Sequence, residues 1–402
     1  MTREEIYNIC LKRLEHNKCL LLELPTGIGK SKMAIDLSKH LCTSVFSGRR
    51  IRLLLLVDKK VHKKTWKEEF EKWGIIQDAD VVTECYASLH KYIGQHFDII
   101  LMDECHHIGS EKRMENFKHL KYSYILGLSA TIPKAVKNFF GYHFHASIVS
   151  CSLDAAIKNK ILPKPQILLW PLTLDDTYLT ESLLVNPHAK GKMIQGDYGK
   201  IWYYRKNKIK AKVLCTSFQK NKELTSDIIY AKKIFFSCKE DAKKAVYKNR
   251  WLLLCNKRLE WYSTLRLPLV QKILARLKDE RTITFCKNIE QTNLLGKWCI
   301  HSQNNKANQY YEDFNKKKIN HITAVNMLNE NANLVDCKYA VFGNLPSSDL
   351  VQVQRTGRAL RHPHPVIIIP YYKDTREEEI IQKMIENMDK NYVKEIHSIN
   401  EI

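Results

Sequence analysis

The sequence has no hydrophobic run long enough to cross a membrane. Its apolar stretch at residues 20–24 is interrupted by Glu23 and stopped by Pro25, and the N-terminus opens with three charged residues at 3–5. A membrane-spanning helix needs about 20 predominantly apolar residues, and a secretory signal needs an uninterrupted apolar region. We therefore expect neither a signal peptide nor a membrane span.

Closely paired cysteines are also lacking. The twelve cysteines lie scattered between Cys10 and Cys337, and none of them forms a CxxC pair. This pattern argues against a zinc ribbon and against a disulfide framework, and it favours a reducing compartment. Neither a solenoid-type repeat nor a low-complexity linker is apparent in the sequence.

Acidic residues are scarce. The chain has 43 Asp and Glu against 65 Lys and Arg, which leaves a net charge of +22, while 44% hydrophobic and 10% aromatic residues suffice for folding. Its 402 residues predict two or three domains, at about 100–200 residues per domain. The cationic excess favours a polyanionic partner, with nucleic acid ahead of an acidic membrane surface; the alternative is a merely soluble basic protein.

Short apolar runs alternate with charged amphipathic stretches, a pattern typical of parallel α/β sheets. Six strands are predicted in a first lobe, at 20–23, 51–57, 81–85, 98–102, 124–128 and 147–151. A second lobe is predicted to hold a helix at 269–277 and strands at 282–286, 321–325, 339–342 and 366–370. We place the first lobe at 1–151, a connecting and inserted basic segment at 152–263, and the second lobe at 264–402.

The inserted segment has its charge concentrated in one place. Residues 200–222 contain eight Lys or Arg and no acidic residue. Within them, four lysines alternate with other residues, which predicts a strand with one cationic face; they are Lys206, Lys208, Lys210 and Lys212. Trp202 stands just before them, so ring faces for bases and cations for phosphates would lie together. Alternatively, Trp202 and Tyr204 pack a small core while the lysines face water.

A phosphate-binding loop is predicted directly after the first strand. Its residues are Thr26, Gly27, Ile28, Gly29, Lys30 and Ser31, and a helical pattern follows over 32–41. Glycines let backbone N–H groups surround phosphate oxygens, the lysine can reach the β and γ phosphates, and the serine hydroxyl can ligate Mg²⁺. Leu24 occupies the first glycine of the general GxxxxGK[ST] pattern, which is a departure from it.

Two acids end the apolar strand at 98–102. Asp103 and Glu104 would lie at the carboxyl edge of a parallel sheet, where a nucleotide binds. Asp103 would then hold Mg²⁺, and Glu104 would position and deprotonate the attacking water. Two alternatives are an ordinary charged strand end and a zinc site made by Cys105, His106 and His107, although adjacent residues point in different directions.

Two further segments carry polar side chains at comparable places. Residues 127–131, with Ser129 and Thr131, close another apolar strand; taken alone, they would read as a turn or helix cap. Residues 354–361 place Arg358 and Arg361 on one helical face, where both can reach a γ-phosphate. Taken alone, this segment would read as a solvated or nucleic-acid-facing basic helix.

The four segments, in this order, resemble superfamily 2 helicases of the DEAD/DEAH type, in particular the DExH helicases of phages, restriction systems and repair enzymes. The resemblance covers about 20–131 and 282–361. It implies two RecA-like P-loop NTPase lobes of the α/β class that bind ATP and Mg²⁺. It assigns catalytic roles to Lys30, Asp103, Glu104, Gln354, Arg358 and Arg361, metal binding to Ser31 and Asp103, and coupling to His106, Ser129 and Thr131.

The resemblance also predicts a nucleic-acid track across both lobes. Residues 57–60 look like motif Ia, 86–89 like Ib, 285–288 like IV and 326–331 like V. The track candidates are Lys59, Lys60, Ser88, Lys287 and Asn329, to which the inserted segment adds Trp202, Lys206 and Lys208. Any single lysine among them can equally be solvated surface.

Two departures from the family pattern stand out. Asn331 replaces a glycine in motif V, and asparagine is the next most tolerant residue of positive φ. Residues 2–8 contain no glutamine where the family reads adenine, which leaves ATP selectivity open.

We expect an ATP-dependent helicase or translocase, monomeric and cytoplasmic (in the host cytoplasm if a phage encodes it). The resemblance favours DNA over RNA as its partner, with replication or repair proteins as associates. One rival is the duplex-translocating motor of a restriction system, and another is a binding or sensing module whose affinity for nucleic acid ATP controls.

Overall fold

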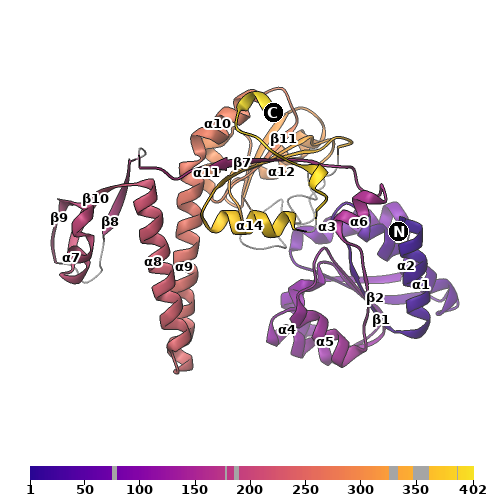
Figure 1. Cartoon of the computed structure of the whole chain (residues 1–402). Coiled ribbons are helices and arrows are strands. Elements are labelled where there is room, and N and C mark those ends of the chain that lie inside the picture. Colours follow the sequence, from indigo (N-terminus) through magenta and orange to yellow (C-terminus); the bar gives the residue numbers. More distant parts are fainter. Residues whose placement is uncertain (75–78, 177–178, 185–189, 326–333, 347–361, 387) are drawn as a thin grey trace.

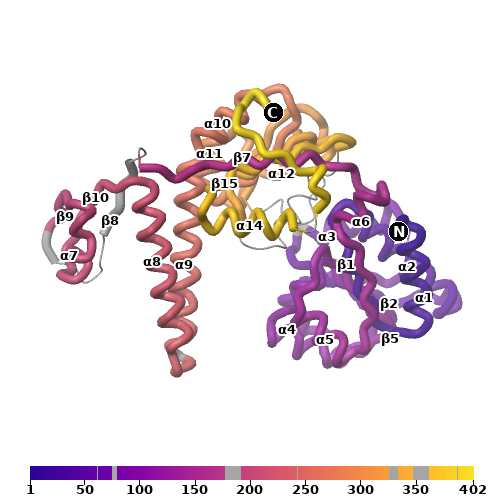
Figure 2. The backbone as a smooth tube through the Cα atoms, in the orientation of Figure 1, coloured from indigo at the N-terminus to yellow at the C-terminus, as the bar shows by residue number. Residues whose placement is uncertain are grey.

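The computed structural model describes residues 1–402 except 75–78, 177–178, 185–189, 326–333, 347–361 and 387 (Figure 1). Two parallel α/β lobes lie side by side, and an inserted segment projects from the second one (Figures 1 and 2). The fold class predicted from the sequence is therefore confirmed. None of the described helices is long and apolar enough to span a membrane.

Lobe 1 is built on a six-stranded parallel sheet in the order β3-β2-β4-β5-β1-β6. Its strands are β1 (Cys19–Glu23), β2 (Ile51–Val57), β3 (Ala79–Cys85), β4 (His96–Met102), β5 (Lys121–Ser129) and β6 (Ser147–Ser150). Its helices are α1 (Arg3–His16), α2 (Lys30–Ser44), α3 (Lys60–Trp73), α4 (Glu111–Lys118), α5 (Lys134–Phe144) and α6 (Leu153–Lys158), with 3₁₀ helices η2 (Tyr86–Tyr92) and η3 (Cys105–Ile108).

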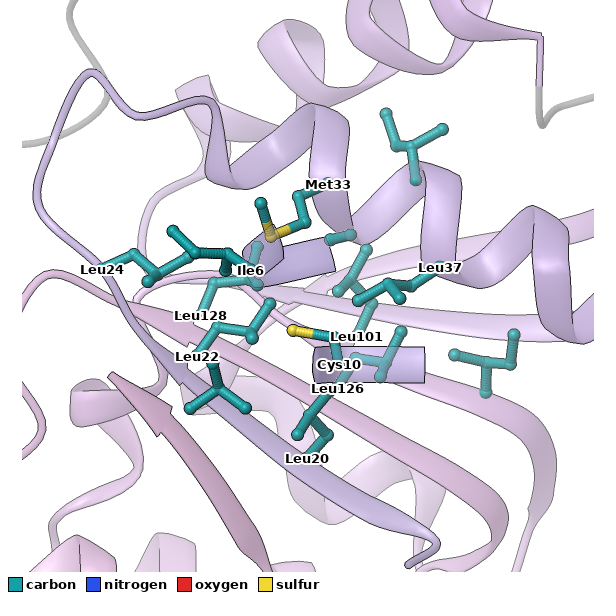
Figure 3. Close-up of a cluster of buried hydrophobic side chains, with 14 of the residues drawn as sticks. Ile6, Cys10, Leu20, Leu22, Leu24, Met33, Leu37, Leu101, Leu126 and Leu128 are labelled. Atoms are coloured by element: carbon teal, nitrogen blue, oxygen red, sulfur yellow. The ribbon is translucent and has the colours of Figure 1, made fainter. Parts of the chain in front are cut away.

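Both faces of this sheet are buried, as expected when helices cover a parallel sheet on each side. Leu20, Leu22 and Leu24 point to the face covered by α1 and α2, whereas Cys19 and Leu21 point to the opposite face. Figure 3 shows the first of these clusters, in which side chains of α1 and α2 meet the leucines of the sheet. The phosphate loop that joins β1 to α2 is thus anchored at both ends by packed core.

Lobe 2 contains a seven-stranded parallel sheet in the order β12-β13-β11-β14-β15-β7-β16. Its strands are β7 (Gln166–Leu172), β11 (Thr282–Phe285), β12 (Cys299–Ile300), β13 (His321–Ala324), β14 (Tyr339–Phe342), β15 (Val366–Tyr372) and β16 (Val393–Glu395). Its helices are α10 (Leu267–Arg276), α11 (Ile289–Leu295), α12 (Ala307–Asn315) and α14 (Arg376–Ile385).

The inserted segment has two parts. A small sheet of β8 (Leu179–Leu184), β10 (Ile209–Thr216) and β9 (Lys190–Gly196) carries the short helix α7 (Ile201–Lys206). A long helical pair follows, α8 (Ser217–Ser237) and α9 (Asp241–Leu265), which projects from lobe 2 with its connection at the free end (Figures 1 and 2). The sequence reasoning did not predict this helical pair.

The base of the helical pair is fixed to lobe 2 by a fully buried arginine. Arg266 forms an ion pair with Glu377 at the start of α14 and donates to the Pro370 carbonyl oxygen at 2.7 Å. Tyr262 of α9 packs against Tyr372, with ring centroids 5.6 Å apart. These contacts hold the end of α9 against the end of β15.

Parts of the expected connecting segment 152–263 belong to the lobes. Helix α6 places Ala156 and Ile157, and Leu162 after them, in the core of lobe 1. Strand β7 pairs with β15 and β16 in the sheet of lobe 2. Sequence order could not show this, because β7 lies far along the chain from the strands that it joins.

Candidate nucleotide and nucleic-acid site

The predicted phosphate loop has the backbone that polyphosphate binding requires. Gly27 and Gly29 adopt φ values of 92° and 96°, in the left-handed region that favours glycine. Gly29 is the N-cap of α2 and supplies no side-chain cap, so the first N–H groups of α2 are available to an anion. Thr26 Oγ1 is buried and has no hydrogen-bond partner among the described residues, as expected of a donor that awaits a ligand.

Leu24 shows why the first glycine of the general pattern can be missing. Its side chain is fully buried in the core of lobe 1, and it is not among the residues with positive φ. Its carbonyl oxygen accepts a hydrogen bond from Lys30 Nζ at 3.0 Å. Because the backbone at this position is ordinary, leucine replaces glycine without strain.

A cavity of about 580 Å³ lies against this loop. The start of α1 contributes Arg3, the middle of α3 contributes Trp66, and the end of β4 contributes Asp103 and Glu104. Because the strands are parallel, the ends of β1 and β4 meet at the same edge of the sheet. The loop and the acids thus face one volume, although more than 70 residues separate them in the sequence.

Both acids are buried and held by neighbours. Asp103 is 5% exposed, and its Oδ2 accepts a hydrogen bond from Trp66 Nε1 at 2.8 Å. The Tyr86 hydroxyl donates to the Asp103 carbonyl oxygen at 2.8 Å. Burial raises the pKa of Tyr86 well above its ordinary value, so this hydroxyl remains a proton donor. Asp103 is therefore oriented through its side chain and its backbone.

Glu104 has an unusual backbone. It is 4% exposed, and its φ of 47° lies in the left-handed region, where a residue with a side chain is uncommon. Such conformations concentrate at functional sites. The strained turn aims the carboxylate at the cavity and not along the strand.

The predicted coupling residues converge on Glu104. Ser129 Oγ lies 3.2 Å from Glu104 Oε2 and 2.9 Å from His106 Nδ1, and it is 2.8 Å from the Thr131 carbonyl oxygen. Gly127 leaves room for the Leu21 side chain of the neighbouring strand β1, because a Cβ at residue 127 would lie only 2.5 Å from it. The structure therefore joins Glu104, His106, Ser129 and Thr131 in one hydrogen-bonded cluster.

The arrangement of 105–107 does not favour the zinc alternative. Cys105 points into the core, and burial raises the pKa of its thiol well above the ordinary value, so it stays protonated. His106 turns to Ser129, whereas His107 Nδ1 lies 3.4 Å from Asp58 Oδ1. Across the part of the chain that the structure describes, no three His, Cys, Asp or Glu residues are grouped to hold a metal.

The predicted track residues lie at strand ends. Lys59 and Lys60 follow β2 and begin α3, where both are exposed, and Ser88 is half-buried in η2. Lys287 follows β11 in lobe 2, and its Nζ lies 3.3 Å from Asn256 Oδ1 of α9. Asn329 with motif V, and the motif VI residues, lie outside the described residues; the latter are Gln354, Arg358 and Arg361.

In the inserted segment, the predicted cationic strand is wrong at its start. Lys206 is the last residue of α7, and Lys208 lies in the following turn with a φ of 54°. Strand β10 begins only at Ile209, so just Lys210 and Lys212 alternate with its buried residues. The alternating lysines run across the turn between α7 and β10, and no glycine or proline there indicates a turn.

Tyr204 and Trp202 of the inserted segment each fit a different one of the two interpretations. Tyr204 is 7% exposed and packs with Ile201 and Val213 in a small core. Trp202 is 67% exposed and stays available to a partner. Arg205 lies between them and pairs with Glu223 and Asp227 of α8, so its charge holds the two parts together.

Two residues at the site, Trp66 after motif Ia and Tyr86 in motif Ib, were given no role toward Asp103 by the sequence motifs. Trp66 and Tyr86 both contact Asp103, yet they come from different elements, α3 and η2. Nothing in the spacing of the sequence connects either ring with the acid. Only the packing of the sheet reveals these contacts.

Two family models match the chain. One, described as type III restriction enzyme, res subunit, matches residues 1–91 and 76–134; the other, described as helicase conserved C-terminal domain, matches 266–363. Comparison with curated protein sequences finds no match. The matched ranges include the phosphate loop and the acidic strand end in lobe 1, and β11, β13 and β14 in lobe 2.

Two solved structures share the fold. The ATP-dependent type ISP restriction-modification enzyme LlaBIII bound to DNA is 12% identical, with a TM-score of 0.59; the match covers 99% of this chain and 31% of that enzyme, so this chain spans about a third of its length. S. cerevisiae Dbp5 bound to RNA and ADP BeF3 is 11% identical, with a TM-score of 0.57, and the match covers 98% and 89% of the two chains. The two family models, matched in order on the two lobes, together with this shared fold support a superfamily 2 helicase of the DExH/DEAD type.

Proposed function

We propose that this helicase acts on DNA and unwinds or remodels duplex or branched DNA as it hydrolyses ATP. The observation that carries the proposal is the convergence of the phosphate loop, Asp103 and Glu104 on one cavity. A module that only bound nucleotide would need the loop but not a buried, strained glutamate at the edge of the same volume.

The residues of lobe 1 divide the work on ATP. The backbone of 26–31 would surround the phosphates, and Lys30 would leave the Leu24 carbonyl to reach the β and γ phosphates. Glu104 would orient the attacking water and accept its proton. Ser129 and His106 hold the Glu104 carboxylate, so they would keep it aimed at that water.

The same site suits Mg²⁺. The Ser31 hydroxyl follows the loop, Asp103 is a buried carboxylate at the cavity, and oxygen ligands of this kind are those that Mg²⁺ prefers. Ser31 and Asp103 would hold the ion, which would supply positive charge beside the phosphates.

Lobe 2 would complete the site from the other side. Arg358 and Arg361, together with Gln354, would approach the γ-phosphate when the lobes close, because guanidinium groups stabilise charge that develops on a transferred phosphoryl group. Nucleic acid held by Lys59, Lys60 and Ser88 on one lobe and by Lys287 and Asn329 on the other would favour that closed state.

The type III restriction family model favours DNA over RNA, since its name refers to an enzyme of DNA restriction. The shared fold alone does not discriminate, because one structural neighbour was solved with DNA and the other with RNA. The net charge of +22 suits either polyanion.

Strand displacement from forked substrates would test the proposal. Each strand would in turn be DNA or RNA, and each single-stranded tail would be 3′ or 5′. We expect ATP-dependent displacement of the DNA forks, with Glu104→Gln as the inactive control. Displacement confined to RNA forks would contradict the choice of DNA.

A second candidate is the translocating motor of a restriction-type assembly. The res-subunit model and the coverage of only 31% of the restriction enzyme favour it. Such a motor would hydrolyse ATP on duplex DNA and strip a third strand from a triplex without separating the duplex. Triplex displacement without fork displacement would therefore select this candidate over the helicase.

A further inference from the structure

Two elements that carry predicted nucleic-acid contacts also contact Asp103. Helix α3 begins at Lys60, and from its middle Trp66 Nε1 donates to Asp103 Oδ2 at 2.8 Å. The 3₁₀ helix η2 carries Ser88, and from its first residue the Tyr86 hydroxyl donates to the Asp103 carbonyl oxygen at 2.8 Å. One acid thus receives a donor from each element.

Both hydrogen bonds are shielded from water. Trp66 is 3% exposed and Tyr86 is 1% exposed. A hydrogen bond inside a protein is electrostatically stronger than one in water, and an acceptor that loses its buried partner is costly. These two donors are neutral, so they fix the position of Asp103 without changing the charge of the cavity.

The connections from the surface to the acid are short and stiff. Lys60 and Trp66 lie within two turns of the same helix, and Ser88 is two residues from Tyr86. The α3 helix is packed at Trp66 and Phe70, whose ring centroids lie 5.5 Å apart. A displacement of either surface contact must therefore move the donor behind it.

We propose that Trp66 and Tyr86 are positioning residues through which nucleic-acid binding at α3 and η2 is transmitted to Asp103. Nucleic acid that binds both elements fixes the two donors, and the donors fix the carboxylate beside the nucleotide. Linkage requires the reverse effect as well, so metal-bound nucleotide tightens nucleic-acid binding by the same factor. The inference rests on the proposed function, which takes Asp103 as a metal ligand and α3 and η2 as part of the track.

The variants Trp66→Phe and Tyr86→Phe each remove a donor and keep an aromatic ring. A matched control lies on η2. Tyr92→Phe removes the hydroxyl of a ring that packs on Phe97, and that contact does not involve Asp103.

Two measurements test the link. The first is the affinity for a fluorescent ADP analogue with and without Mg²⁺, and the second is the ATPase rate against oligonucleotide concentration. We expect Trp66→Phe to lose about tenfold of the affinity gained from Mg²⁺, since a hydrogen bond to a charged group is removed. Trp66→Phe and Tyr86→Phe should each lose several-fold of the stimulation by nucleic acid, and the Tyr92→Phe control should keep it.

The double variant makes the inference specific. If both donors act through Asp103, the loss of stimulation in Trp66→Phe/Tyr86→Phe will differ from the product of the single losses, as expected of residues that share a partner. Parent-level stimulation in either single variant would overturn the proposal. Tyr86→Phe, which removes one oxygen atom, decides the matter if Trp66→Phe does not fold. A parent protein with no Mg²⁺-dependent nucleotide binding would instead refute the proposed function.

Discussion

The phosphate-binding edge of lobe 1 and the inserted segment both combine charged and aromatic side chains, but they hold them differently. At the edge of lobe 1, Asp103 and Glu104 are buried, and hydrogen bonds from Trp66 and Ser129 fix their positions. In the inserted segment, Trp202 and Lys206 are exposed, whereas Tyr204 packs in a small core and Arg205 pairs with Glu223 and Asp227.

Because of this difference in burial, the sequence indicates the role of the lobe 1 acids more specifically than the role of the exposed lysines. A buried carboxylate must be compensated by its neighbours, so its position at a strand end already restricts its partners. An exposed lysine carries no such requirement, and it suits solvent as well as phosphate. Substitutions in lobe 1 should therefore change chemistry steeply, and those in the inserted segment should change binding gradually.

The largest effect is expected at the phosphate-binding edge of lobe 1. Glu104→Gln keeps the shape of the side chain but removes the proton acceptor, so turnover should fall about 10²-fold or more while ATP still binds. Lys30→Ala removes a charge beside the phosphates, so ATP affinity and turnover should both fall. Steady-state ATPase rates and nucleotide titrations of both variants provide the measurement, and parent-level turnover in Glu104→Gln would refute the assigned base.

The next effect distinguishes Tyr204 from Trp202 in the inserted segment. Tyr204→Ala opens the small core with Ile201 and Val213 and should lower the free energy of unfolding by about 2 kcal/mol. Trp202→Ala should change that stability by no more than about 0.5 kcal/mol, because its ring is exposed. Thermal denaturation of the two variants measures this contrast, and equal losses would show that Trp202 packs as Tyr204 does.

Binding should show the opposite order for the same pair. If Trp202 stacks on a base, Trp202→Ala should weaken single-strand binding by about 1–3 kcal/mol. A fluorescence anisotropy titration with a labelled oligonucleotide at fixed salt tests this. Tyr204→Phe is the control: it keeps the buried ring and removes only the hydroxyl that accepts from the Asp197 N–H. Unchanged affinity in Trp202→Ala would exclude the stacking role.

The most gradual effect concerns the lysines. Reversing the charges of Lys206, Lys208 and Lys210 should flatten the slope of log K against log salt by about 2 units, at about 0.7 per phosphate contact. ATPase without nucleic acid should not change. The same reversal at Lys316, Lys317 and Lys318, which already pair with carboxylates on lobe 2, is the matched control. An unchanged slope would assign the first three lysines to solvated surface.

The strands could be predicted well from the sequence. The predicted strands at 51–57 and 339–342 coincide with β2 and β14, because buried parallel strands appear as nearly continuous apolar runs. The helical pair α8 and α9 could not be predicted in this way, since many of its apolar residues are exposed and do not mark one buried face; Ile229 and Leu253 are examples. The strand β10 was placed three residues early, because alternation alone does not show where a turn ends.

The sequence by itself determined the chemistry that this protein carries: the order of phosphate loop, acidic strand end and small polar strand end, and the alternation that buries both sheet faces. These are local features, fixed by residues adjacent in the chain. Only the tertiary structure decided which distant groups share a site. Trp66 and Tyr86 reach Asp103, and β7 joins the sheet of lobe 2, because parallel strands bring distant segments to a common edge, where hydrogen bonds and burial select the partners.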